Sequence, residues 1–165
     1  MERTGWQKTW VRILTTGLTF AVMALIFCFS MEDAEQSNET SGTISREVTP
    51  VVYPDYYRKE PAEQLIMYDN VQHVVRKEAL FSEFAILGLM IRLCLESWFG
   101  RRRFMLPAAW IAGVLYAATD ELHQLRIDGR SGQRSDVMLD SCGVLAGVLA
   151  ASLILYLWWR KRHQA

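Results

Sequence analysis

The sequence lacks a charge excess of either sign, because its 18 Lys and Arg residues are matched by 18 Asp and Glu residues. A general nucleic-acid-binding protein is normally basic overall, so the balance argues against that class. The chain has only 3 cysteines and no CxxC spacing, which argues against a disulfide framework. With 4 prolines and 10 glycines it is neither collagen-like nor of low complexity. Its 165 residues suit a single domain spanning 1–165.

Apolar residues are gathered in long blocks, and most charged residues lie between these blocks. At a rise of ~1.5 Å per residue, a block of about 20 residues spans the ~30 Å hydrocarbon layer of a membrane. The first block is followed by no A-x-A-like cleavage site, so it is interpreted as an uncleaved anchor. The predicted fold is therefore an all-α integral membrane bundle of four transmembrane helices, at about 11–30, 80–99, 104–121 and 137–159.

Basic residues predict how the four spans are oriented. They cluster before the first span, between the second and third spans at 101–103, and after the last span at 160–162. The long connection over 31–79 has ten acidic residues against five basic ones. Because basic residues favour the cytoplasmic side, both termini are predicted to be cytoplasmic and 31–79 to be an outer loop.

The outer loop divides into two parts by composition. Residues 31–61 contain three of the four prolines and the run SNETSGT, so an irregular segment is expected. In residues 62–79, apolar side chains recur at helical spacing, which predicts an extracytoplasmic amphipathic helix. This helix could lie on the outer leaflet or extend the second span along the bundle, and both alternatives remain open.

Ionisable residues are concentrated where the predicted spans reach the outer side. Such residues are costly at membrane depth and usually serve a site or a buried pair. Asp136 and Asp140 are four apart and share a helix face with Gly143 and Gly147, so Asp140 is expected to face the bundle. Glu121 is placed toward the bundle by the same spacing argument. The candidate residues are Lys77, Glu83, Asp120, Glu121, His123, Gln124, Arg130, Ser131, Asp136 and Asp140.

These candidates support three interpretations. In an enzyme directed at a lipid headgroup or phosphate, the catalytic group comprises Glu121, His123, Asp120 and Asp136, with His123 or Glu121 as general base. The substrate-binding group then comprises Arg130, Ser131, Gln124, Glu83, Asp140 and Lys77, with Arg130 on the phosphate. In a binding protein, the same arginine holds an anionic lipid without chemistry. In a scaffold, the charges pair with one another and fix the helices. The buried-looking pair Arg92 and Glu96 is interpreted as structural.

No metal or cofactor is predicted. One histidine and scattered acids do not form a defined ligand spacing. The expected partners are membrane lipids or lipid-linked envelope precursors, with no nucleic acid.

Several short motifs then occur in a characteristic order. The stretch TDELHQ at 119–124, the turn GRSG at 129–132, and Asp136, Val137, Asp140 and Gly143 resemble the signature of VanZ-like membrane proteins. The start of the second span, around Lys77, Phe81 and Glu83, is also similar to that family. Leu80 stands where the family often has a histidine, and Asp128 where it usually has a proline.

The resemblance implies a multi-pass protein of the bacterial cytoplasmic membrane that acts at its outer face. The namesake of the family gives low-level resistance to the lipoglycopeptide teicoplanin, with little effect on vancomycin. The function expected from the resemblance is lowered susceptibility to teicoplanin-type lipoglycopeptides through a change in the envelope or its lipids. The alternative is a non-catalytic membrane scaffold or an anionic-lipid-binding protein for envelope assembly.

Overall fold

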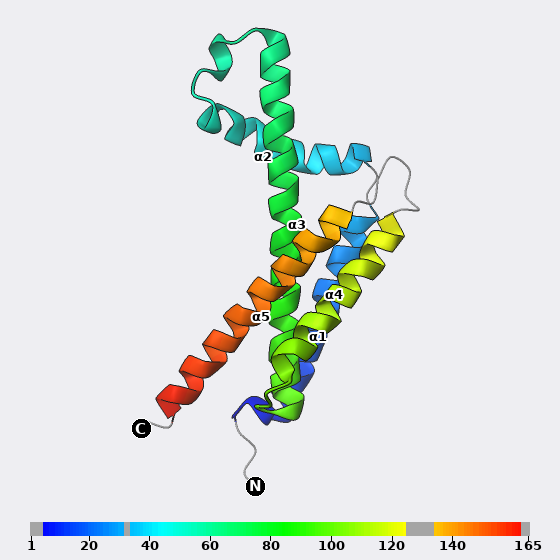
Figure 1. The fold of residues 1–165 in the computed structure, drawn as a ribbon, viewed down its shortest axis with the longest axis vertical. Helices are drawn as coiled ribbons and strands as arrows, with labels where there is room; N and C mark the ends of the chain where they lie inside the picture. The colour runs from blue at the N-terminus through cyan, green and yellow to red at the C-terminus, as the bar shows by residue number, and fades with distance from the viewer. Residues whose placement is uncertain (1–4, 32–33, 125–133, 163–165) are drawn as a thin grey trace.

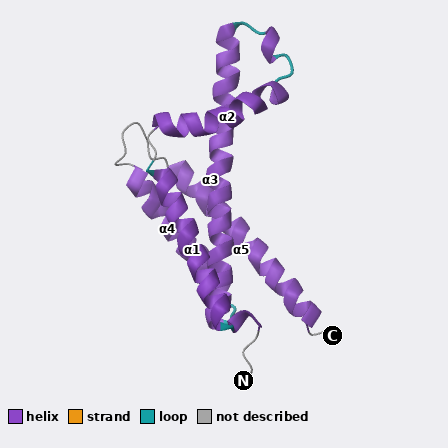
Figure 2. Cartoon of the chain, turned by 180° about the vertical axis from the view of Figure 1, so that it is seen from behind, coloured by secondary structure: helices purple, strands orange, loops and turns teal. Residues whose placement is uncertain are grey.

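The computed structural model describes residues 5–31, 34–124 and 134–162. Helices joined by short turns make up this part of the chain, and no strand occurs in it, as Figure 2 shows. The predicted all-α class is thus confirmed. The helices are α1 (Thr9–Ser30), α2 (Ala34–Val52), α3 (Pro61–Phe99), α4 (Met105–Gln124) and α5 (Arg134–Arg162), with single 3-10 turns at Gly5–Gln7 and Tyr56–Arg58.

Two of the described helices are long and apolar enough to cross a membrane, α1 and the Ser135–Arg162 part of α5. Only 17% of the apolar stretch of α1 and 33% of that of α5 are buried, whereas the core helix of a soluble protein is mostly buried. Charged residues recur along α3, and α4 ends in an acidic turn. The two apolar helices fit a membrane protein, while the crossing of all four spans stays a prediction.

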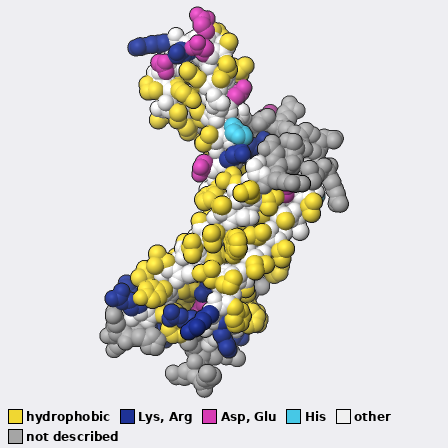
Figure 3. Space-filling model, viewed as in Figure 1, with side chains coloured by type: hydrophobic (Ala, Val, Ile, Leu, Met, Phe, Trp, Pro, Cys, Tyr) yellow, Lys and Arg dark blue, Asp and Glu magenta, His cyan; other side chains and the backbone are white. Residues whose placement is uncertain are grey.

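The bundle consists of α1, α4, α5 and the C-terminal half of α3, with both termini at one end (Figure 1). The N-terminal part of α3 continues beyond the bundle at the opposite end and carries α2 across it. Apolar side chains cover the bundle, and charged side chains gather at both ends of the molecule and at the narrow part above the bundle (Figure 3). We call the end with the termini and the α3–α4 turn the basic end. The opposite end of the bundle, where α4 ends and α5 begins, is the acidic end.

The prediction of an irregular segment over 31–61 is wrong for most of that range, because α2 occupies Ala34–Val52. Its serine and threonine hydroxyls bond back to the preceding turn, from Ser45 to the Ser41 carbonyl (2.9 Å) and from Thr49 to the Ser45 carbonyl (2.6 Å). One face also packs on α3, where the Gln72 amide donates to the Ser41 hydroxyl at 3.3 Å. Tertiary packing thus outweighs the low helix propensity of this segment.

A single long helix also settles the alternatives for residues 62–79. These residues belong to α3, which runs unbroken from Pro61 to Phe99, so they extend the second predicted span. Pro61 stands in the first turn, where a missing N–H costs nothing. Gly100 ends the helix with a φ of 68°, in the left-handed region that favours glycine.

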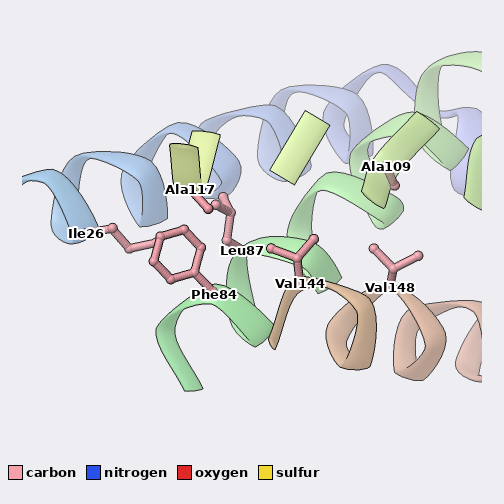
Figure 4. Packing of buried hydrophobic residues seen from close by; sticks show 7 residues of the cluster. All are labelled: Ile26, Phe84, Leu87, Ala109, Ala117, Val144 and Val148. Carbon is pink, nitrogen blue, oxygen red and sulfur yellow. The ribbon is translucent and has the colours of Figure 1, made fainter. Parts of the chain in front are cut away.

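The closest helix contact joins α3 and α5. A Cβ atom added to Gly147 would collide with the Ala85 backbone carbonyl, and one added to Gly143 would collide with that of Phe81. The predicted role of these small residues in helix approach is confirmed. The core beside this contact is shown in Figure 4 and consists of Ile26, Phe84, Leu87, Ala109, Ala117, Val144 and Val148.

Candidate functional site

The acidic end brings carboxyl groups from three helices together. Asp120 and Glu121 lie in the last turns of α4, Asp140 lies in the second turn of α5, and Glu83 comes from α3. The exposed fractions of Asp120, Glu121 and Asp140 are 4%, 7% and 2%, so these three are buried, as helical spacing predicts for the last two. Burying a carboxylate is costly unless it is compensated, which marks this group as the best candidate site.

Asp140 is at the centre of this group. The carboxyl groups of Asp120, Glu121, Asp136 and Glu83 all lie within electrostatic range of it and carry the same sign of charge. Its Oδ1 atom is buried and has no hydrogen-bond partner within the described part of the chain. Like charges in a poorly solvated site repel one another strongly. The arrangement is therefore suited to receive a proton, a hydrogen-bond donor or a cationic group.

Lys77 reaches this cluster from α3. Its Nζ atom lies 3.4 Å from Oδ1 of Asp136, and both side chains are partly exposed. An ion pair of that exposure contributes about 1 kcal/mol at most. Lys77 thus links α3 to the start of α5, while the more deeply buried Asp140 has no such cation at hydrogen-bond distance within the described residues.

A cavity of about 340 Å³ opens beside the cluster, between the ends of α1 and α4. Asp120 and His123 both contribute to its lining, as do Phe27 and Tyr116. The His123 ring stacks on Phe27 with ring centroids 4.8 Å apart, which fixes the imidazole at the cavity wall. An imidazole and a carboxyl group on one cavity are a suitable pair for proton transfer to a bound molecule.

Hydrogen bonds hold the residues of this wall in place. Gln124 donates from Nε2 to Oδ2 of Asp120 at 3.0 Å, so the predicted candidate Gln124 orients an acid. The Tyr116 hydroxyl donates to the Met23 carbonyl at 2.6 Å and ties α4 to α1. Tyr116 and Phe27 were not predicted as site residues. The spacing of Tyr116 to Asp120 could have indicated the former, since residues four apart share a helix face.

Some predicted residues are not placed by the structure. Arg130 and Ser131 lie outside the described residues, and so does the GRSG turn that contains them. Within the described ranges, no three His, Cys, Asp or Glu side chains are grouped as metal ligands would be. Glu83 and Asp136 do join the acidic cluster, so the residues predicted on α3, α4 and α5 gather at one end of the bundle.

Comparison with known proteins gives one match. The family model described as VanZ/LLP1 matches residues 16–156, from the first half of α1 to the last turns of α5. The match includes the whole acidic cluster. No curated protein and no solved structure matches the chain.

Proposed function

The chain belongs to the VanZ/LLP1 family, and on this basis we propose that it acts on membrane lipids or lipid-linked envelope precursors at the outer face of a bacterial cytoplasmic membrane. In this proposal the four predicted spans cross the membrane, with the basic end and both termini in the cytoplasm. The acidic end then faces outward, at the level of the lipid headgroups.

The observation that carries the proposal is the buried Asp140 among four other carboxyl groups. Five carboxyl groups so close together do little to stabilise a fold, even with Lys77 paired to Asp136, because each added carboxylate raises the repulsion. Such a cluster is a good device for binding the cationic or hydrogen-bond-donating part of a polar headgroup. Arg130 and Ser131, which follow α4 in the sequence, suit the phosphate of the same headgroup.

Chemistry at this site would use the cavity beside the cluster. His123 and Asp120 line it together, so a proton can pass between either group and a bound headgroup. In this hypothesis His123 or Glu121 is the general base, and Asp136 and Asp140 orient the others. Chemistry on the headgroup and binding alone are two forms of the same proposal, since both need the acidic cluster.

The consequence in the cell would be lowered susceptibility to teicoplanin-type lipoglycopeptides. Teicoplanin carries an acyl tail that can insert into the outer leaflet, whereas vancomycin has none. A protein that changes the lipids or lipid-linked precursors of that leaflet should therefore affect teicoplanin more than vancomycin.

Expression of the wild-type chain in a Gram-positive host tests this function. We expect the inhibitory concentration of teicoplanin to rise while that of vancomycin stays unchanged. Lipid extracts of the same cells, compared with cells carrying an empty vector, should show whether a headgroup or precursor changes. An unchanged teicoplanin value, or an equal rise for both antibiotics, would contradict the proposed role in lipoglycopeptide tolerance.

A non-catalytic scaffold for envelope assembly is the second candidate. It is favoured by the links between α3 and α5, namely the ion pair of Lys77 with Asp136 and the backbone contact at Gly147. A scaffold of this kind depends on the folded bundle alone. No substitution at the acidic end should then leave a stable protein without function.

A further inference from the structure

At the basic end, we infer a binding site for a phosphate group in the cavity between α3, α4 and α5. The cavity has a volume of about 460 Å³, within the range of ligand-binding pockets. Four arginines contribute to its lining, Arg92 and Arg101 to Arg103, against the single acid Glu96. This site lies at the other end of the bundle from the acidic cluster, so it stands independently of the proposed function.

The buried wall of the cavity already has its charge balanced. Nη1 of Arg92 lies 3.0 Å from Oε2 of Glu96, and both side chains are buried. Nε of Arg92 donates to the Ser152 hydroxyl of α5 at 3.2 Å. The single acid of the lining is thus engaged by Arg92, and the guanidinium is held rigidly between two helices. The predicted structural role of the Arg92–Glu96 pair agrees with this geometry.

The three arginines at the mouth of the cavity are not paired with an acid as Arg92 is. Arg101, Arg102 and Arg103 form the exposed turn between α3 and α4. Their side chains make no hydrogen bond or ion pair with any residue that the structure describes. The turn itself is compact, because Gly100 ends α3 and the Met105 amide donates to the Arg102 carbonyl at 3.1 Å.

Two other arginines at the same end are used within the protein. Arg12 donates from Nε to the Ser97 carbonyl at 3.0 Å and lies over the Trp98 ring, 5.1 Å from its centroid. Arg162 lies over the Trp158 ring at the same distance. The arginines of the α3–α4 turn therefore differ from these neighbours in having no partner of either kind within the described residues.

This arrangement suits a phosphate group. Guanidinium groups match phosphate oxygens by pairs of charge-assisted hydrogen bonds, and an excess of one charge sign in a concave site concentrates the field. Basic pockets between membrane helices bind phosphate-bearing headgroups in this way. Tyr156 and Trp159 also line the cavity, and such residues favour the membrane–water interface. The phosphate could belong to an anionic phospholipid or to a soluble phosphate compound.

Native mass spectrometry of the purified full-length chain, with added phosphatidylglycerol or phosphatidylcholine, tests this site. We expect the wild type to retain phosphatidylglycerol about tenfold more tightly. The triple substitution R101Q/R102Q/R103Q should remove this preference. The matched control R160Q/K161Q/R162Q removes the same charge from the same end, but none of its residues lines the cavity, so it should keep the preference.

A second variant separates the pocket from any effect of charge on membrane insertion. Ser152→Phe fills the cavity without changing a charge and should also remove the preference. Ala150→Phe adds the same ring at an exposed position outside the cavity lining and should not. The proposal would be overturned if R101Q/R102Q/R103Q and R160Q/K161Q/R162Q lost the preference for phosphatidylglycerol equally. It would also be overturned if the wild type retained the two lipids equally and did not bind inorganic pyrophosphate.

Inorganic pyrophosphate distinguishes the two sources of the phosphate. If it displaces bound phosphatidylglycerol, or binds when that lipid does not, the site takes soluble phosphate compounds. If the lipid binds and millimolar pyrophosphate does not displace it, the site takes a lipid headgroup.

Discussion

Replacing Gly147 by alanine is expected to lower the thermal unfolding temperature and the amount of folded protein in the membrane. The added Cβ would collide with the Ala85 carbonyl and approach the Leu89 amide, both backbone atoms of α3. Backbone atoms cannot rotate away as a flexible side chain can, so α3 and α5 would have to separate. Overpacking of this kind typically costs about 1–3 kcal/mol, a large share of a stability of about 5–15 kcal/mol. The amount of protein in the membrane fraction and its thermal unfolding temperature measure the effect.

Gly17 provides the matched control for this change. It lies within α1, and a Cβ added there would meet no atom within 4 Å. Alanine is favoured over glycine in a helix interior by roughly 0.5–1 kcal/mol, so Gly17→Ala should be neutral or stabilising. If Gly147→Ala proved as stable as Gly17→Ala, the close backbone contact of α3 and α5 would be incorrect.

Asp140→Asn is expected to abolish function while leaving the fold as stable as the wild type or more so. The substitution keeps the shape of the side chain but removes one member of a group of five carboxyls. The amide is neutral and can donate a hydrogen bond to a neighbouring carboxylate, so stability should stay the same or rise, as is common when a costly functional arrangement is relaxed. Thermal unfolding of the purified protein and teicoplanin susceptibility of the expressing cells measure the two effects.

The scaffold hypothesis predicts a different result for the same variant. If the acidic cluster held the helices together, Asp140→Asn would lower the unfolding temperature, and any loss of function would follow the loss of protein. Lys77→Met is the reference for such an effect, because it removes the ion pair to Asp136 on the same two helices. A destabilised Asp140→Asn protein would therefore contradict the proposed role of this residue.

Long apolar runs and helical spacing made much of the fold predictable. The runs at 11–30 and 137–159 are long and almost free of charge, which predicts helices, and they lie in α1 and α5. The spacing of residues four apart predicted that Glu121 and Asp140 face the bundle, and both side chains are buried. Such local signals succeed where a residue's surroundings depend on its own helix face.

The sequence could not indicate α2 with the same ease. Its serines and threonines favour turns in isolation, and packing on α3 offsets that preference. The continuous α3 could have been predicted better, because Pro61 and Gly100 are typical start and stop residues. No sequence pattern indicated that Phe27 lines the cavity, because its contact with His123 joins residues far apart in the chain.

The most direct test of the central claim is teicoplanin and vancomycin susceptibility of cells expressing the wild type, Glu121→Gln or Glu78→Gln at equal membrane levels. Glu121 is buried in the acidic cluster, whereas Glu78 on α3 is exposed, so the same change is made in two settings. The account predicts selective teicoplanin tolerance with the wild type and Glu78→Gln, and its loss with Glu121→Gln. Full tolerance with Glu121→Gln would contradict a functional role for the acidic end.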